Sequence, residues 1–305
     1  MKYKIYKLSF TTPVHFGTGV LSESAINFCA DTLFSALYIE AIKLDMADQL
    51  YSAVKEGKLL ISDAFPYMDK RYFLPKPMIY IEPKEQGNST VKKKYKKIKY
   101  IPVEEIGNFL SGNLNPENCD MQDLGKEYSQ VMSAVRREEE DALPYRVGNY
   151  LFNEDCGLYV IATFANEDVE YLLNDLFTSL SYSGIGGKRS SGKGRFVLEI
   201  KNGIKDERLQ AMLERKSDKY MLISSALPTE SELETALDGA SYLVHKRSGF
   251  VYSENYSDEE MKKRDLYTMQ AGSCFTKSFT GDIYDVDEGG NHPVYRYAKG
   301  MFLGV

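Results

Sequence analysis

Alternating hydrophobic and polar residues at the start of the chain predict a β-strand over residues 2–12. Lysines occupy several of the intervening polar positions. The side chains expected to face a core are Tyr3, Ile5, Leu8 and Phe10. We therefore expect the chain to begin with a strand of a sheet.

Apolar residues at helical spacing predict two helices that would cover this sheet. The first spans residues 32–44, with Asp31 as its N-cap, and the second spans residues 168–182. The apolar positions are Leu33, Phe34, Leu37, Ala41 and Leu44 in the first helix and Val169, Leu172, Leu173, Leu176, Phe177 and Leu180 in the second.

Short apolar runs predict further strands around these helices. Residues 59–62 and 195–200 each fit one strand, and residues 145–152 with 157–164 are expected to form a hairpin whose second strand is central. The segment Leu74–Pro77 contains two prolines and is expected to be irregular. Without an insertion, the order β, α, β, β, α, β is that of a ferredoxin-like α+β domain.

Residues 82–150 form the predicted insertion in this first domain, which spans residues 1–212. Val91–Lys99 is lysine-rich around Tyr95, and Arg136–Asp141 is charged throughout. The lysine run is either an arm that contacts phosphates, with Tyr95 for stacking, or the solvated face of a helix. The carboxylates of the charged run are expected on a solvated surface.

A second domain is predicted for residues 213–305, as a second ferredoxin-like unit. Strands are expected over residues 220–226 and 241–245, with a short helix between them that Thr229 or Ser231 caps. Later strands are expected within residues 267–279 and 294–305.

The segment Ser183–Phe196, between the second helix and the last strand of the first domain, has the composition of a binding loop. It contains five glycines and four cations, Lys188, Arg189, Lys193 and Arg195, and no acidic residue. Glycine lets another backbone approach closely, and exposed N–H groups beside cations can hold phosphate oxygens. The alternative is a solvated, flexible basic loop.

The order of elements excludes the common nucleotide-binding loops. Arg189 stands where a Walker loop needs a hydroxyl and where a dinucleotide fingerprint needs its third glycine. The loop also connects a helix to a strand, whereas those folds use the opposite junction.

Composition and charge further narrow the classes of protein to which the chain could belong. The net charge of −6 argues against general affinity for nucleic acid but allows a local basic groove. No apolar run is long enough for a membrane span, and the cysteines, Cys29, Cys119, Cys156 and Cys274, are far apart. We expect a cytoplasmic protein with buried thiols, no metal site and no cofactor.

Six segments together resemble one family. They are Leu8–Gly17 (LSFTTPVHFG), Ala30–Leu37 (ADTLFSAL), Leu74–Pro77 (LPKP), Tyr182–Phe196 (YSGIGGKRSSGKGRF), Lys246–Phe250 (KRSGF) and His292–Lys299 (HPVYRYAK). This set is similar to the RAMP superfamily of CRISPR proteins, and within it to subunit four of type III-A (Csm) effector complexes. The resemblance extends over nearly the whole chain.

The resemblance implies two ferredoxin-like, RRM-related domains with a thumb-like insertion in the first. It implies a subunit that binds the 5′ repeat-derived tag of the crRNA and caps that end of the ribonucleoprotein in antiviral defence. The thumb would displace a nucleotide where the tag meets the guide. The partners implied are the large cyclase/polymerase-like subunit and backbone subunit three, with target RNA contacted only indirectly.

The resemblance assigns candidate RNA-binding residues but no nuclease centre. The loop positions that match the family are Gly184, Gly186, Gly187, Lys188, Arg189, Ser190, Ser191 and Gly192. Further candidates are His15 and, in the second domain, Lys246, Arg247, Ser248 and Phe250.

A catalytic alternative uses His15, one of three histidines with His245 and His292. Metal-independent RNA cleavage needs a general acid and base near the 2′-hydroxyl, and His15 with Lys188 could supply them if the loop lies beside the first turn. The alternatives are that His15 binds RNA or orders its own turn. We therefore expect a non-catalytic subunit, with a repeat-specific endoribonuclease as the second hypothesis.

Overall fold

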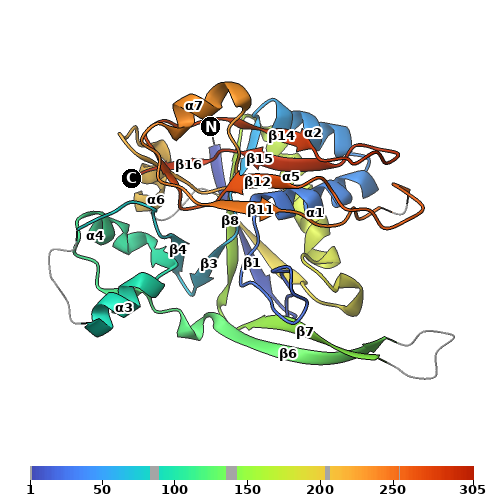
Figure 1. Cartoon of the computed structure of the whole chain (residues 1–305), viewed down its shortest axis with the longest axis horizontal. Coiled ribbons are helices and arrows are strands. Elements are labelled where there is room, and N and C mark those ends of the chain that lie inside the picture. Colours follow the sequence, from blue (N-terminus) through green and yellow to red (C-terminus); the bar gives the residue numbers. More distant parts are fainter. Residues whose placement is uncertain (1, 83–88, 135–142, 203–206, 254) are drawn as a thin grey trace.

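A seven-stranded antiparallel sheet lies at the centre of the computed structural model, which describes residues 2–82, 89–134, 143–202, 207–253 and 255–305 (Figure 1). The strands in order of pairing are β5 (Tyr100–Pro102), β4 (Arg71–Pro75), β3 (Phe65–Met68), β8 (Cys156–Phe164), β1 (Lys2–Phe10) and β9 (Phe196–Asn202), and β2 (Leu59–Ile61) also pairs with β8. The predicted first strand and the central position of β8 are confirmed.

The sheet is buried on both faces. The alternating pattern along β1 predicted a core on one face alone. Ile5 belongs to one hydrophobic cluster, whereas Tyr6 and Leu8 belong to another on the opposite face. Tyr3 and Phe10 are only partly buried. All of β8 is buried, as expected for a strand covered on both sides.

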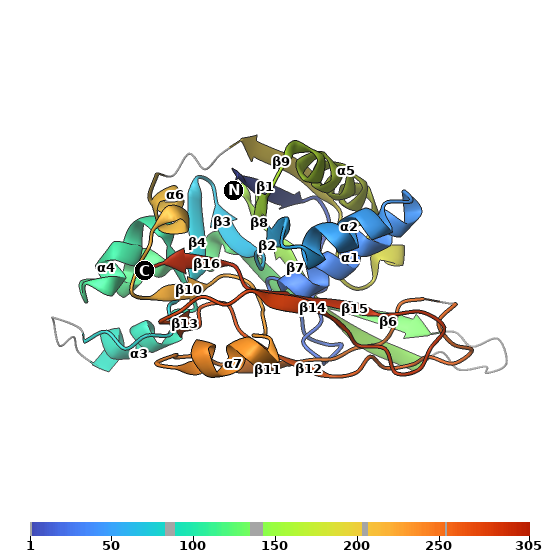
Figure 2. The same cartoon turned by 90° about the horizontal axis from the view of Figure 1, so that it is seen from above.

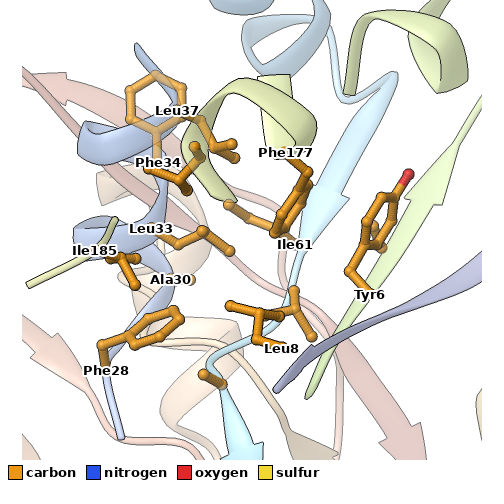
Figure 3. Close-up of a cluster of buried hydrophobic side chains, with 14 of the residues drawn as sticks. Tyr6, Leu8, Phe28, Ala30, Leu33, Phe34, Leu37, Ile61, Phe177 and Ile185 are labelled. Carbon is orange, nitrogen blue, oxygen red and sulfur yellow. The ribbon is translucent and has the colours of Figure 1, made fainter. Parts of the chain in front are cut away.

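Three helices cover one face, and their apolar side chains form the larger cluster (Figure 3). They are α1 (Ala30–Lys43), α2 (Ala47–Lys55) and α5 (Glu167–Ser183). The prediction that Asp31 caps α1 is wrong, because Cys29 is the N-cap. The backbone N–H of Ala30, at the start of the helix, donates to Asp63 at 2.7 Å instead. Leu44 follows the helix and is exposed, not internal.

Elements from both halves of the chain cover the other face (Figure 2). They include α4 (Ile106–Leu110), α6 (Glu207–Glu214), β10 (Tyr220–Leu222) and β16 (Phe302–Gly304). Met221 and Leu303 pack in the same cluster as Ile5. The second half of the chain therefore completes the core of the first.

Two local predictions in the first half are wrong. Residues 145–152 lie in β7 (Leu143–Phe152), which pairs with β6 (Gly125–Ala134) and not with β8. This β6–β7 hairpin extends away from the main sheet (Figure 1). The segment expected to be irregular is so only at Lys76 and Pro77, because Leu74 and Pro75 form the end of β4, where Pro75 lies opposite Tyr100.

The lysine-rich run forms helix α3 (Ser89–Lys97), and short 3₁₀ turns follow it. These turns are η1 (Val103–Glu105), η2 (Pro116–Cys119) and η3 (Gln122–Leu124). The predicted charged run Arg136–Asp141 lies outside the described residues.

The second half contains short strands in three small sheets. The pairings are β13 (Cys274–Phe275) with β10 and β16, β11 (Val244–Arg247) with β12 (Leu266–Met269), and β14 (Gly281–Asp285) with β15 (Tyr295–Lys299). Thr229 caps α7 (Glu230–Leu237) in a capping box with Glu232, as one of the two predicted caps. In the part of the chain that the structure describes, no helix is both long and apolar enough to cross a membrane.

Candidate nucleic-acid interface

The glycine loop, residues 184–194, connects α5 to β9 as predicted. It contains one 3₁₀ turn, η4 (Arg189–Ser191). Lys188, Gly192 and Gly194 have φ values of 59°, 81° and 79°, in the left-handed region. A Cβ on Gly194 would lie 2.1 Å from the carbonyl oxygen of Ile185. This position therefore requires glycine for the loop to close on itself.

The base of the loop is fixed against the turn that follows β1. The N–H of Gly187 donates to the carbonyl of His15 at 2.8 Å, and that of Gly194 donates to the carbonyl of Pro13 at 3.0 Å. Ile185 is buried in the larger cluster (Figure 3). The prediction that loop and turn lie together is confirmed, and the loop is anchored rather than free along its base.

His15 lies beneath the loop with its ring buried. Its Nδ1 is 2.7 Å from the carbonyl oxygen of Gly148 in β7, so Nδ1 carries the proton and donates. A Cβ on Gly187 would lie 2.7 Å from Cδ2 of the same ring. His15 therefore connects the loop, its own turn and the β6–β7 hairpin, which favours an ordering role.

Two cations of the loop face aromatic rings instead of carboxylates. The Nζ of Lys188 lies 5.1 Å from the ring centre of Tyr145, and the Cζ of Arg189 lies 5.3 Å from that of Tyr252. Among the described residues, no carboxylate forms an ion pair with either cation. As far as the described residues go, both charges are therefore available to an external anion.

The other two cations of the segment differ from this pair. Lys193 is buried, its Nζ donates to Oε1 of Gln130 at 2.9 Å, and burial lowers its pKa. Arg195 is exposed, and its backbone binds Thr11 and Thr12. Ser190 and Ser191 are exposed beside Arg189. Lys193 thus holds the loop against the β6–β7 hairpin. Residues 188–191 form the outer part of the loop.

Tyr145 and Tyr252 were not predicted as site residues. Tyr145 lies on β7, and Tyr252 lies in the second half of the chain with 75% of its surface exposed. The glycine loop thus contacts the β6–β7 hairpin through Lys188 and the C-terminal half of the chain through Arg189. Their contacts depend on tertiary structure alone, and nothing in the local sequence distinguishes these two among the many tyrosines.

The segment Lys246–Phe250 is engaged with the protein itself. Lys246 pairs with Asp265 at 2.7 Å, and Arg247 donates to both carboxylate oxygens of Asp31 at 2.9 and 2.7 Å. Burial alone would raise the pKa of Asp31, but the guanidinium of Arg247, and next that of Arg296, hold it below its usual value.

The remaining predicted residues of this segment are open or weakly engaged. Ser248 is exposed, and its carbonyl accepts a long hydrogen bond of 3.5 Å from Arg296. Phe250 is 48% exposed, with the Nζ of Lys262 5.7 Å from its ring centre. Phe250 therefore offers an exposed aromatic surface.

The lysine run of α3 presents its cations to solvent and its tyrosine to the protein. The ring centre of Tyr95 lies 6.4 Å from that of Phe109, and the Nζ of Lys76 lies 4.3 Å from the same ring. Lys94 pairs with Glu117 at 2.6 Å. Of the two alternatives for this run, these contacts favour the solvated helix face, because Tyr95 is occupied.

The other candidate chemistry is sparse. His292 binds the hydroxyl of Ser253 at 2.8 Å, and burial, with the nearby charge of Arg247, lowers the pKa of His245 to about 4. Within the described ranges, no cluster of three or more His, Cys, Asp or Glu side chains could hold a metal ion. The cysteines are free thiols, and burial raises the pKa of Cys274 to about 12.

Solved structures similar to this chain share its fold over its whole length. A Csm1–Csm4 cassette in complex with AMPPNP matches with a TM-score of 0.65 and 20% identity, covering 100% of this chain and 98% of that chain. A Csm3–Csm4 subcomplex from the type III-A CRISPR-Cas interference complex matches with a TM-score of 0.66 and 19% identity, covering 100% and 99%. At these identities the match shows the fold.

Sequence relatives are closer. A family profile described as the CRISPR Csm4 C-terminal domain matches residues 215–305. The CRISPR system Cms protein Csm4 of Mycobacterium tuberculosis (strain CDC 1551 / Oshkosh) is 37% identical over 100% of this chain and 98% of its own length. The protein of the same name from Streptococcus thermophilus is 36% identical over 99% of each chain. The chain therefore belongs to the Csm4 family of CRISPR proteins.

Proposed function

We propose that this chain is the non-catalytic crRNA-binding subunit of a type III-A CRISPR ribonucleoprotein, where it binds and caps the 5′ repeat-derived tag. One observation supports this most directly. Lys188 and Arg189 stand on an anchored glycine loop, face aromatic rings, and form no ion pair with a described carboxylate. A strand of RNA supplies both missing partners, phosphates for the cations and bases for the rings.

The two tyrosines extend the proposed site on either side of the loop. RNA-binding proteins read single strands by splaying bases onto aromatic rings while cations hold the phosphates. Tyr252 is mostly exposed and Tyr145 is half-buried, so each offers part of a ring to a base. The strand would then cross the loop between the β6–β7 hairpin and the C-terminal half.

The architecture supports the domain assignment that we propose. The elements β1, α1, β2, β8, α5 and β9 follow the order of a ferredoxin-like domain, and β1 lies between β8 and β9. All but the last two residues of the β6–β7 hairpin lie in the predicted insertion, and the hairpin projects from the sheet, as a thumb would (Figure 1). Residues 213–305 would be the second domain, with its strands divided among smaller sheets.

The protein partners are proposed from the solved neighbours. One neighbour is a Csm1–Csm4 cassette and another a Csm3–Csm4 subcomplex. We propose that this chain likewise connects the large cyclase/polymerase-like subunit to the backbone subunit, and contacts target RNA only through the assembled complex. The absence of catalysis is part of the proposal, because His15 is buried and its Nδ1 is engaged with Gly148.

The decisive experiment measures RNA retention over a salt series. Lys188→Ala/Arg189→Ala should weaken binding to a crRNA carrying the tag. The slope of log K against log salt should fall by roughly 1.4, since each lost phosphate contact on a single strand accounts for about 0.7. Lys70→Ala/Lys277→Ala removes the same charge from two exposed lysines outside the loop and serves as the control. Equal slopes in both variants would exclude the loop as the binding site.

A cleavage assay separates the scaffold from the endoribonuclease. Purified protein is incubated with repeat RNA in the presence of a metal chelator, and we expect the RNA to remain intact. Cleavage that disappears in a folded His15→Ala variant would establish the enzyme instead.

A further inference from the structure

A buried cluster of charges between α1 and the C-terminal strands contains more cations than carboxylates. Asp31, in the first turn of α1, accepts hydrogen bonds from Arg247 of β11 at 2.7 and 2.9 Å and from Arg296 of β15 at 2.6 Å. The Asp31 side chain is 2% exposed and the Arg296 side chain 7%. Two guanidinium groups therefore share one buried carboxylate, and the Arg247 side chain is 22% exposed.

Lys263 adds a third positive charge to the same cluster. Its N–H donates to the carbonyl of Gly249 at 2.8 Å, so the segment around Lys263 runs beside the one that follows Arg247. Successive residues of an extended chain point to opposite sides. Lys262 lies over the exposed ring of Phe250, which directs Lys263 inward. Burial, and next the charge of Arg296, lower the pKa of Lys263 to about 8.

The next carboxylate is already committed to other donors. Asp63 is fully buried and accepts the N–H of Ala30, the N–H of Ser225 and the hydroxyl of Ser225 at 2.7 to 2.9 Å. Its oxygens fix the start of α1 to the strand after β10. Asp63 therefore already has three donors, none of which is a cation of the cluster.

An unused donor points to a missing acceptor. The Nε of Arg296 is buried and has no hydrogen-bond partner among the described residues, although the residue is only 6% exposed. A buried guanidinium N–H without an acceptor is costly, so an external acceptor would relieve it. Space exists beside the cluster, because a Cβ on Gly249 would meet nothing within 4 Å.

We propose that Arg247, Lys263 and Arg296 form an anion site whose occupant is a phosphate group. A phosphate brings further negative charge to three cations whose nearby carboxylates are Asp31 and Asp63, and its oxygens can accept from the free Nε and the ammonium together. The site is separate from the glycine loop, and its existence does not depend on RNA binding there.

Thermal unfolding with inorganic phosphate tests the site without RNA. At about 20 mM phosphate, against chloride at equal ionic strength, the Tm of the wild type should rise by roughly 2–4 °C, because the ligand binds only the folded chain. Lys263→Gln should lose most of this rise. Lys262→Gln changes the neighbouring lysine, which points outward, and should keep it.

The same variant has a second signature without phosphate. Lys263→Gln removes a half-buried cation that lies near two arginines, so its Tm in chloride should equal or exceed that of the wild type. No phosphate-induced rise in the wild type, or an equal rise in Lys263→Gln, would overturn the proposal. A lower Tm of Lys263→Gln in chloride would also overturn it, because the ammonium would then have a partner within the protein.

A further arm identifies the source of the phosphate. The titration is repeated with saturating single-stranded RNA bound to the full chain. A phosphate effect that disappears assigns the site to a phosphodiester of the RNA, and one that persists assigns it to a free phosphate compound. Both results require the site.

Discussion

The glycine loop and the segment Lys246–Phe250 have nearly the same chemistry in the sequence but different roles in the structure. Each combines adjacent Lys and Arg with serine and glycine. In the glycine loop, Lys188 and Arg189 face rings and form no ion pair with a described carboxylate. In the second segment, Arg247 is held by Asp31 at 2.7 Å. Local composition therefore does not distinguish a binding cation from a structural one.

The difference arises from where the counter-charge is supplied. A desolvated arginine needs a carboxylate to offset the cost of burial, whereas a cation at the surface remains hydrated. Asp31 lies far from Arg247 in the sequence, and only the packing of α1 against the C-terminal strands joins them (Figure 2). Whether a basic residue is free to bind a ligand therefore depends on the tertiary structure and not on the local sequence.

Removing the shared carboxylate should have the largest effect. Asp31→Ala leaves Arg247 and Arg296 buried without their counter-ion and should lower the free energy of unfolding by about 3–5 kcal/mol. Lys188→Ala/Arg189→Ala should change it by less than about 0.5 kcal/mol per site. Urea denaturation monitored by circular dichroism measures both. Similar losses in the two variants would remove the distinction between the regions.

The pH dependence of stability should also come from the buried region. Burial raises the pKa of Asp63 to about 6, although hydrogen bonds from Ala30 and Ser225 oppose the shift. The folded state therefore holds this proton more tightly than the unfolded state, whose pKa is near 3.8. The contribution of Asp63 to stability is present below pH 4 and is lost as pH rises through 6.

The variant Asp63→Asn isolates this contribution, because the amide has the same shape and does not titrate. Relative to the wild type, it should gain up to about 3 kcal/mol between pH 4 and pH 7. Denaturation curves at several pH values give this difference. A constant difference between the two proteins would show that Asp63 does not titrate in this range.

A pair of glycines tests whether the loop acts as an anchored unit. Gly192 and Gly194 have similar φ values of 81° and 79°, but only at Gly194 would a Cβ collide with the backbone of Ile185. Gly192→Ala should cost about 1–2 kcal/mol for the left-handed conformation alone. Gly194→Ala should cost clearly more and should lower RNA affinity, because the loop detaches from its base. Equal stability and affinity in the two variants would show that closure of the loop is unimportant.

The smallest effect is expected at Lys246. Its ion pair with Asp265 is exposed, so Lys246→Ala should leave the Tm unchanged within error. RNA binding by this variant then reports only on direct contact. A loss of affinity comparable to that of the double variant in the glycine loop would place the two segments in one site.

The sequence allowed the main elements of the first half to be predicted, because their periodicity coincides with burial. The helix over residues 168–182 agrees with α5 to within one residue at each end, and the helix over residues 32–44 differs from α1 by two residues at its start and one at its end. The loop between α5 and β9 was located by glycine and charge alone. Its docking on His15 followed from the position of both at one end of the sheet.

The failures occurred where distant residues decide the local structure. Asp31 has the chemistry of an N-cap, but Arg247 and Arg296 draw its side chain into an ion cluster, and Asp63 binds the helix start instead. Residues 145–152 pair with β6, the strand that precedes them in the sequence, because β8 already has β1, β2 and β3 as neighbours. Neither the ion pairs of Asp31 nor the pairing of β7 can be predicted from a short segment of the sequence.

The position of β1 has a consequence for biosynthesis. During translation β1 emerges well before β8 and β9, the two strands that pair with its edges (Figure 2). At about 5–20 residues per second, roughly 10–40 s separate the emergence of β1 from that of Asn202. The nascent chain therefore carries an unpaired strand until β8 and β9 emerge, and we expect chaperones that bind extended peptides to occupy it during that time.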